Sequence, residues 1–215
     1  MVLLADIFGA HFSQILGVLV ASYAVGCVTL GYYLVRTVTG MDVRQLGSGS
    51  VGAKNVGRVL GVWGFAVTFA GDLGKGALAV WATERVNPND FLKLLAMLAV
   101  IVGHIWPAQL RFNGGKGMAT AAGALLVFNP WIMAGLLAVF AVILVALRKT
   151  VLAGLGAFGI LPLLGGLLTQ PMIITVGLVV VTLIVLFAHR QNLKEELAGL
   201  AANRKCPTRP NPTPE

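Results

Sequence analysis

Charged residues are scarce in this sequence. They make up 11% of its 215 residues, whereas soluble domains carry roughly 25%. Only eight residues are acidic. There are two cysteines, and because Cys27 lies in an apolar run and Cys206 in a polar segment, we expect no disulfide between them. Hydrophobic residues reach 57%, and the mean hydropathy is +0.86. The composition therefore excludes an ordinary soluble domain and predicts an integral membrane protein.

Long apolar runs predict an all-α membrane protein with seven transmembrane helices, the fourth of them short. The expected spans cover residues 13–35, 59–83, 91–110, 118–128, 131–147, 150–169 and 172–188. We assign residues 1–200 to this single membrane domain and expect residues 201–215 to form a polar, disordered tail. Eleven helical residues span about 16 Å, half a bilayer. Either the turn before the fourth span enters the membrane or neighbouring helices bury this short helix, beside a polar cavity.

Basic residues are distributed unevenly over the two sides of this arrangement. Of the 16 Lys and Arg residues, thirteen fall on the side of the C-terminus, Arg85 and Lys93 fall on the other, and Lys75 lies within the second span. Because cytoplasmic loops collect Lys and Arg, we expect the N-terminus outside and the C-terminus in the cytoplasm. The same bias accounts for the net charge of +8, so we expect no nucleic-acid partner.

The first loop on the basic side contains "GSGSVGAKNVGR", residues 47–58. Small residues such as Ser48 and Gly49 let backbone N–H groups approach an anion, and Lys54 and Arg58 add positive charge. A helix that begins near Ala53 would turn its N-terminal dipole toward the same place. The pattern favours a phosphate site, and the alternative is a flexible loop with ordinary basic residues.

A second glycine-rich turn, "FNGGKGMAT", covers residues 112–120. Gly114 and Gly115 can expose backbone donors, and Lys116 can reach a phosphate. His104 lies about two helical turns earlier, and we expect it to be a hydrogen-bonded structural residue rather than a catalytic one.

The third polar element, "HRQNL", begins where the last span ends. His189 and Asn192 are three residues apart and therefore share a helical face. A histidine there can act as a base near neutral pH, and an amide can orient a substrate. The alternative is a polar helix end. Within the second span, Asp72 and Lys75 are also three apart, and we expect them to pair with each other rather than line the cavity.

Together these motifs resemble those of the bacterial acyl-phosphate:glycerol-3-phosphate 1-acyltransferases, PlsY-like membrane enzymes of phospholipid biosynthesis. The segments "GSGSVGAKNVGR", "DLGKG", "GHIWP", "FNGGKGMAT" and "HRQNL" match the family's motifs in order. The resemblance implies a multi-pass protein of the bacterial inner membrane with its active site facing the cytoplasm. It implies transfer of a fatty acyl group from acyl phosphate to the 1-hydroxyl of glycerol 3-phosphate, giving lysophosphatidic acid and phosphate, with no cofactor and no metal.

The resemblance also implies roles for individual residues. His189 and Asn192 match the family's catalytic pair, and it stays open whether His189 removes a proton or only orients the substrate. His104, Asp72 and Lys75 are candidates for support. The implied phosphate-binding residues are Ser48, Gly49, Gly52, Lys54, Asn55, Arg58, Gly114, Gly115 and Lys116.

Four positions depart from the family's pattern, which leaves a relative with another acceptor as an alternative. They are Ser50, Lys54, Val151 and Gly154. A transporter of a phosphorylated solute is a further alternative, although the chain shows no repeated halves and its motifs lie on one face only. We expect a monomer in contact with membrane lipid, and the resemblance leaves open the docking of an acyl-phosphate-producing enzyme.

Overall fold

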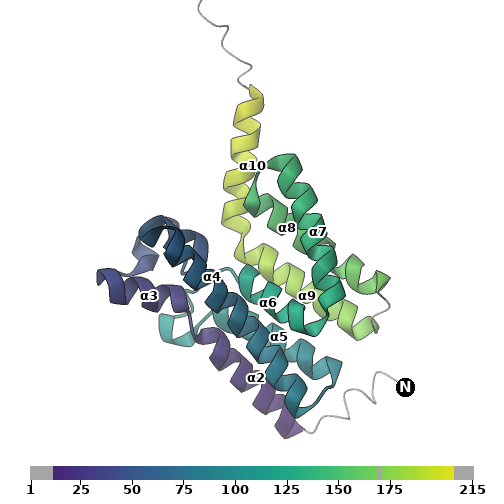
Figure 1. The fold of residues 1–215 in the computed structure, drawn as a ribbon. Coiled ribbons are helices and arrows are strands. Elements are labelled where there is room, and N and C mark those ends of the chain that lie inside the picture. Colours follow the sequence, from purple (N-terminus) through teal and green to yellow (C-terminus); the bar gives the residue numbers. More distant parts are fainter. Residues whose placement is uncertain (1–11, 169–170, 206–215) are drawn as a thin grey trace, which may run out of the picture.

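The computed structural model describes residues 12–168 and 171–205, which form helices and loops with no strand among them. Figure 1 shows α2, α4, α5 and α6 packed together, α7, α8 and α9 beside them, and α10 projecting away. The all-α prediction is confirmed for these residues. The helices are α2 (Phe12–Cys27), α3 (Leu30–Thr39), α4 (Ala53–Val86), α5 (Asp90–Ile105), α6 (Met118–Phe128), α7 (Pro130–Leu147), α8 (Thr150–Leu167), α9 (Met172–Ala188) and α10 (Arg190–Lys205), with short 3₁₀ turns η1 (Val43–Gln45) and η2 (Ala108–Leu110).

Several helices are long and apolar enough to cross a bilayer. Five candidate spans occur among the described residues, or six if α9 and the first part of α10, which bend by 62° against each other, count as one. The short apolar helix α6 comes in addition. Large apolar side chains face outward, and Val62, Trp131 and Val145 are 77–85% exposed, as expected of a surface that lipid covers. The count of seven crossings and their orientation stay predictions.

Helix bounds agree closely with the expected spans in some places and differ in others. α6 and α9 have the predicted bounds, and α4 begins at Ala53 as expected. α4 bends at Gly61, whose φ of 76° is a conformation that glycine adopts without strain. α5 ends at Ile105 rather than at residue 110, because Pro107 lacks the backbone N–H that a continuing helix needs.

The predicted disordered tail, residues 201–215, lies partly outside the described residues. Residues 201–205 belong to α10, and residues 206–215 lie outside the described part of the chain, as do residues 169–170 at the end of the sixth predicted span. α10 follows α9 directly. An ion pair of 3.2 Å between Lys149 and Glu196 ties it to the loop that precedes α8.

The short helix α6 is buried by its neighbours. A Cβ atom at Gly123 would lie 1.9 Å from the carbonyl oxygen of Leu73, and one at Gly76 would lie 2.0 Å from that of Thr120. Glycine at these positions therefore lets the backbones of α4 and α6 touch. α5 and α7 also pack against α6, so burial by neighbours, one of the two expected explanations, accounts for a helix of half the bilayer thickness.

The predicted first span is not one continuous helix. It is interrupted between α2 and α3, and this break leaves helix-end carbonyl groups without partners in the backbone. The Lys75 ammonium donates hydrogen bonds to two of them, at 3.0 Å to Gly26 and 2.8 Å to Val28. Since Lys75 lies on α4, a charge far away in the sequence stabilises the break.

Lys75 is also part of a buried charged cluster. Its Nζ lies 3.1 Å from Asp72 Oδ1, and the same oxygen lies 3.4 Å from Nδ1 of His104 on α5. All three side chains are buried. The expectation that Asp72 and Lys75 pair with each other is confirmed, and neither lines the large cavity described below.

This cluster predicts a large loss of stability on Asp72→Asn. Removing one partner of a buried ion pair leaves the other charge uncompensated, so we expect the free energy of unfolding to fall by about 3 kcal/mol or more. Asp90→Asn is the matched control, because Asp90 pairs with Lys93 at the same spacing but is largely exposed; its loss should stay below about 1 kcal/mol. Unfolding titrations in mixed micelles measure both, and equal losses would contradict the assignment.

Candidate functional site

A cavity of about 710 Å³ lies where α5 and α9 end and α4 begins. Its walls come from all three polar motifs, which are far apart in the sequence. Ile105, Trp106 and Phe112 give it an apolar side. Among the predicted site residues, those that line it are Ser48, Gly49, Arg58, Gly114, Gly115, Lys116 and Asn192.

A small apolar cluster brings the first two motifs together. Val51 and Val56 belong to the first motif and Val43 precedes it. All three are buried in one cluster with Leu110, which precedes the glycine turn. Arg44 reinforces the contact by donating a hydrogen bond of 2.9 Å to the carbonyl oxygen of Leu110. The spacing of the motifs in the sequence gives no sign of this cluster.

Arg44 is itself held by an acidic neighbour. Its guanidinium pairs with Asp42 at 2.6 Å, and this contact lowers the pKa of the Asp42 carboxyl and raises that of Arg44. The pair thus fixes the direction of the Arg44 side chain toward the second motif.

Asn55, which was expected among the phosphate-binding residues, does not line the cavity. Its side chain is buried behind the first loop, where Oδ1 accepts from the backbone N–H of Ser48 at 2.8 Å. Its Nδ2 donates to the carbonyl oxygens of Val43, Leu46 and Ser50. Since these bonds occupy the amide, Asn55 shapes the loop and does not face the cavity.

The glycine N–H groups expected to bind phosphate are also engaged within the protein. In the first loop, Gly49 donates to Leu46, and Gly52 donates to the Ser50 hydroxyl. In the second motif, Gly114 donates to the carbonyl oxygen of Ile105 and Gly115 to that of His104. These last two bonds satisfy carbonyl groups at the end of α5. In this structure these four N–H groups therefore already have acceptors within the protein, and their expected contacts with phosphate stay a prediction. The side chains of Arg58 and Lys116 are the cationic groups at the wall that are suited to hold an anion.

Lys116 is the cation that joins the second and third motifs. Its ammonium donates a hydrogen bond to Oδ1 of Asn192, at the start of α10. Burial lowers the pKa of Lys116; the negative charge of Glu195 opposes this shift, and the positive charges of Arg58 and Lys54 add to it. Lys54 itself is exposed and does not line the cavity, so its influence there is through charge alone.

His189 lies just behind the cavity wall, at the junction of α9 and α10. Its Nδ1 is 2.9 Å from the carbonyl oxygen of Val185. Because a carbonyl can only accept, Nδ1 carries the proton, and in the neutral ring Nε2 is left as the basic atom. Burial lowers the pKa of His189, the Val185 carbonyl opposes this, and the charge of Lys116 lowers it further. A neutral imidazole is thus the form that the site favours.

His104 lies behind the glycine turn, and the hydrogen-bonded structural role expected of it stays a prediction. A Cβ at Gly115 would lie 2.0 Å from its Nε2. The ring therefore fills the space that any larger residue at position 115 would need. Through His104, the buried charges of Asp72 and Lys75 adjoin the turn that carries Lys116.

Some residues of the cavity wall were not expected. Of the departures from the family pattern, Ser50 lines the cavity, whereas Lys54, Val151 and Gly154 do not. Gln191 and Glu195 line it together with Asn113 and Arg190. For Glu195 a signal exists in the sequence, since it follows Asn192 by three residues and so shares its helical face. Val151 and Gly154 lie in the first turn of α8, where a Cβ at Gly154 would lie 2.5 Å from Met118 Sδ.

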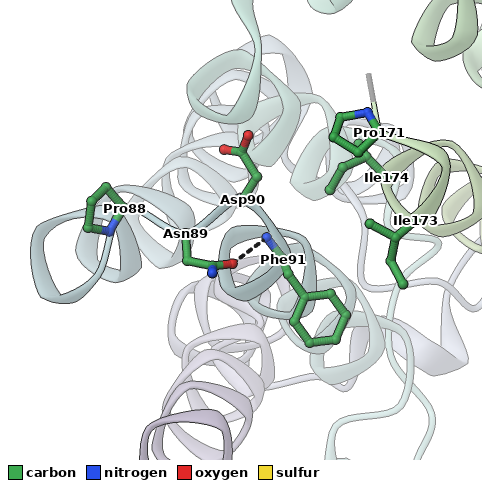
Figure 2. A pocket seen from close by; sticks show the side chains of 7 residues that line it. All are labelled: Pro88, Asn89, Asp90, Phe91, Pro171, Ile173 and Ile174. Atoms are coloured by element: carbon green, nitrogen blue, oxygen red, sulfur yellow. Dashed lines mark hydrogen bonds between the residues drawn. The ribbon is translucent and has the colours of Figure 1, made fainter. Parts of the chain in front are cut away.

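A smaller hollow of about 250 Å³ lies at the other ends of α5 and α9 (Figure 2). Among the described residues, Asp90 is the one charged residue that lines it, and it pairs with Lys93 at 2.7 Å. The remaining lining residues are Pro88, Asn89, Phe91, Pro171, Ile173 and Ile174. A wall with no cation does not suit a phosphate, so we place the candidate site in the larger cavity.

The model of one protein family, described as glycerol-3-phosphate acyltransferase, matches residues 16–199. The chain belongs to this family. A glycerol-3-phosphate acyltransferase 1 of Desulfitobacterium hafniense is 45% identical over 53% of this chain and 56% of its own length. A glycerol-3-phosphate acyltransferase of Clostridioides difficile is 43% identical over 56% of this chain and 61% of its own length. The matched parts thus span little more than half of these curated relatives.

Solved structures of the glycerol-3-phosphate acyltransferase family share the fold. The chain is similar to PlsY (YgiH), an integral membrane glycerol 3-phosphate acyltransferase, in its glycerol 3-phosphate form, with a TM-score of 0.80 and 28% identity over 86% of this chain and 92% of the other. It is also similar to the lysophosphatidic acid form, with a TM-score of 0.77 and 27% identity over the same shares.

The contact between Gly115 and His104 predicts that Gly115→Ala weakens the binding of phosphate, with inorganic phosphate as the probe, at least about tenfold. The added methyl group must displace His104 or the turn, and either movement shifts Lys116. Calorimetric titration of the purified protein measures the change. Gly74→Ala is the control, since nothing lies within 4 Å of a Cβ at that position. Unchanged affinity of the Gly115 variant would show that the turn tolerates a side chain.

The environment of His189 predicts a neutral ring with its proton on Nδ1 at pH 6.5, the ordinary pKa of histidine, where an unperturbed ring is half charged. Nitrogen NMR shifts of protein labelled in its histidines distinguish the two neutral tautomers and the charged form. The spectrum of His189→Gln identifies the signal. A half-protonated ring at that pH would contradict the effect of burial on this group.

Proposed function

We propose that the protein transfers a fatty acyl group from acyl phosphate to the 1-hydroxyl of glycerol 3-phosphate, releasing lysophosphatidic acid and phosphate. The main support is the gathering of Arg58, Lys116 and Asn192 at one cavity. His189 lies between the lining residues Ala188 and Arg190, and its environment favours the neutral ring. Similarity to an acyltransferase structure in its glycerol 3-phosphate form adds to it. A cavity with cations on one side and apolar residues on the other suits two phosphate groups and the start of an acyl chain.

Side chains hold the phosphate groups in this proposal. Arg58 and Lys116 supply the charge, and the Ser48 hydroxyl supplies a neutral hydrogen bond. Lys54 strengthens the positive field from outside the cavity. Asn192 holds the Lys116 ammonium in place, so that it keeps its position before any substrate arrives.

In the chemical step, the 1-hydroxyl oxygen attacks the acyl carbonyl carbon. A new ester C–O bond forms, and the bond from the carbonyl carbon to the phosphate oxygen breaks. Acyl phosphate is an activated anhydride, so positioning and charge compensation suffice without a covalent enzyme nucleophile. The hydroxyl proton passes to Nε2 of His189, the basic atom of the favoured tautomer, and then to the departing phosphate.

The setting of the reaction follows from the charge distribution of the sequence. We place the cavity on the cytoplasmic side of a bacterial inner membrane, with α6 as the fourth and shortest of seven crossings and the N-terminus outside. The acyl chain extends from Trp106 and Phe112 toward lipid. The protein works as a monomer without cofactor or metal, and an enzyme that makes acyl phosphate is the natural supplier of its donor.

One assay tests this function. Purified protein receives acyl phosphate and glycerol 3-phosphate, and the release of phosphate and the formation of lysophosphatidic acid are followed together. Both products should appear in equal amounts, and neither should appear when acyl-CoA replaces acyl phosphate. Phosphate release without the lipid product would refute the proposed acceptor, and uptake of glycerol 3-phosphate into vesicles without any product would favour a transporter.

The same assay should separate the site residues from their surroundings. We expect Lys116→Ala, His189→Ala and Asn192→Ala each to lower kcat/KM at least about a hundredfold, because each removes a group at the reacting atoms or the residue that holds one. Lys194→Ala is the control, since Lys194 is exposed on α10 and does not line the cavity. Full activity of the three site variants would overturn the assignment of the site.

A further inference from the structure

One acidic side chain lines the cavity that is otherwise suited to anions. Glu195 lies on α10 and shares the wall with Arg58, Lys116 and Arg190. Its negative charge acts on Lys116, yet no ion pair joins it to any cation in the described part of the chain, whereas the next residue, Glu196, pairs with Lys149 at 3.2 Å. A free carboxylate beside a phosphate site repels the ligand's phosphate, so a positive role for it must involve another part of the ligand.

A carboxylate can only accept hydrogen bonds, and the groups of a glycerol phosphate that can donate them are its hydroxyls. The 1-hydroxyl is the nucleophile in the proposed reaction and must give up its proton elsewhere. The 2-hydroxyl does not react and keeps its proton. It is therefore the natural partner for the Glu195 carboxylate.

The geometry of α10 agrees with this partnership. Asn192 and Glu195 are on the same face, and three residues of helix advance about 4.5 Å along the axis. Asn192 holds Lys116, which contacts the phosphate in our proposal, so Glu195 lies one step farther along the cavity wall. That separation is comparable to the distance from the phosphate of glycerol 3-phosphate to its second carbon.

We infer that Glu195 determines acceptor specificity by accepting a hydrogen bond from the 2-hydroxyl of the phosphorylated acceptor. This inference rests on the proposed function for the identity of the acceptor. It adds that the site selects phosphates of polyols with a hydroxyl donor next to the reacting carbon. The alternative is a simple counter-ion that lowers the affinity of the empty cavity for every anion alike.

Direct binding measurements separate these roles. Calorimetry is carried out with glycerol 3-phosphate and with 3-hydroxypropyl phosphate, which lacks only the 2-hydroxyl. The wild-type protein should bind glycerol 3-phosphate about tenfold to a hundredfold more tightly, as expected for a hydrogen bond to a charged group. In Glu195→Ala the two affinities should agree within about twofold, and in Glu195→Gln the preference should be intermediate, because the amide oxygen still accepts. Glu196→Gln is the matched control and should keep the wild-type ratio.

Each outcome decides the inference. An equal preference in the wild type and in Glu195→Ala would overturn it, and so would tighter binding of both ligands by that variant, which is the counter-ion result. The acyl-transfer assay tests the proposed function separately. If the protein catalyses acyl transfer but binds both ligands equally well, only the role of Glu195 is refuted. If the preference for glycerol 3-phosphate depends on Glu195 but no acyl transfer occurs, only the acyltransferase function is refuted. Failure of the wild-type protein to bind either ligand would overturn both.

Discussion

The candidate site depends on holding an ammonium group in place beside other cations. Burial disfavours the charged form of Lys116, and the positive charges of Arg58 and Lys54 disfavour it further. Left alone, such a side chain would turn toward water. The hydrogen bond from Lys116 to Asn192 prevents this with a neutral oxygen, which holds the ammonium without neutralising it. The cation is thus fixed in position and still able to bind a phosphate.

The Lys116 ammonium keeps its position only if the loops around the cavity are rigid. Buried polar groups make these loops rigid on two sides of the cavity. Behind the first loop, the Asn55 amide bonds the backbone at several points. Behind the glycine turn, His104 rests against Gly115 and adjoins the pair of Asp72 and Lys75. Such groups are tolerated within an apolar bundle only when they are paired. The same bonds that satisfy them fix the loops of the site.

Sequence patterns predicted the parts of the fold that depend on local composition. The bounds of α6 and α9 follow from unbroken apolar runs, and the residues that gather at the cavity follow from motif spacing and charge. The break between α2 and α3 could not be predicted, since its residues, Val28 and Thr29, include no proline or glycine and its stabilising partner, Lys75, is distant in the sequence. The engagement of glycine N–H groups, such as that of Gly115, depends on carbonyl groups exposed where α5 ends, which only the folded chain reveals.

The positive charges at the cavity also bear on His189. Burial lowers the pKa of the imidazole and the charge of Lys116 lowers it further, so the neutral ring is favoured. A bound phosphate would compensate that charge and make the ring more basic, because a nearby anion favours the protonated form. With Nδ1 held by Val185, the added basicity appears at Nε2. The groups that bind phosphate would therefore make the base ready to accept a proton only once the substrate is in place.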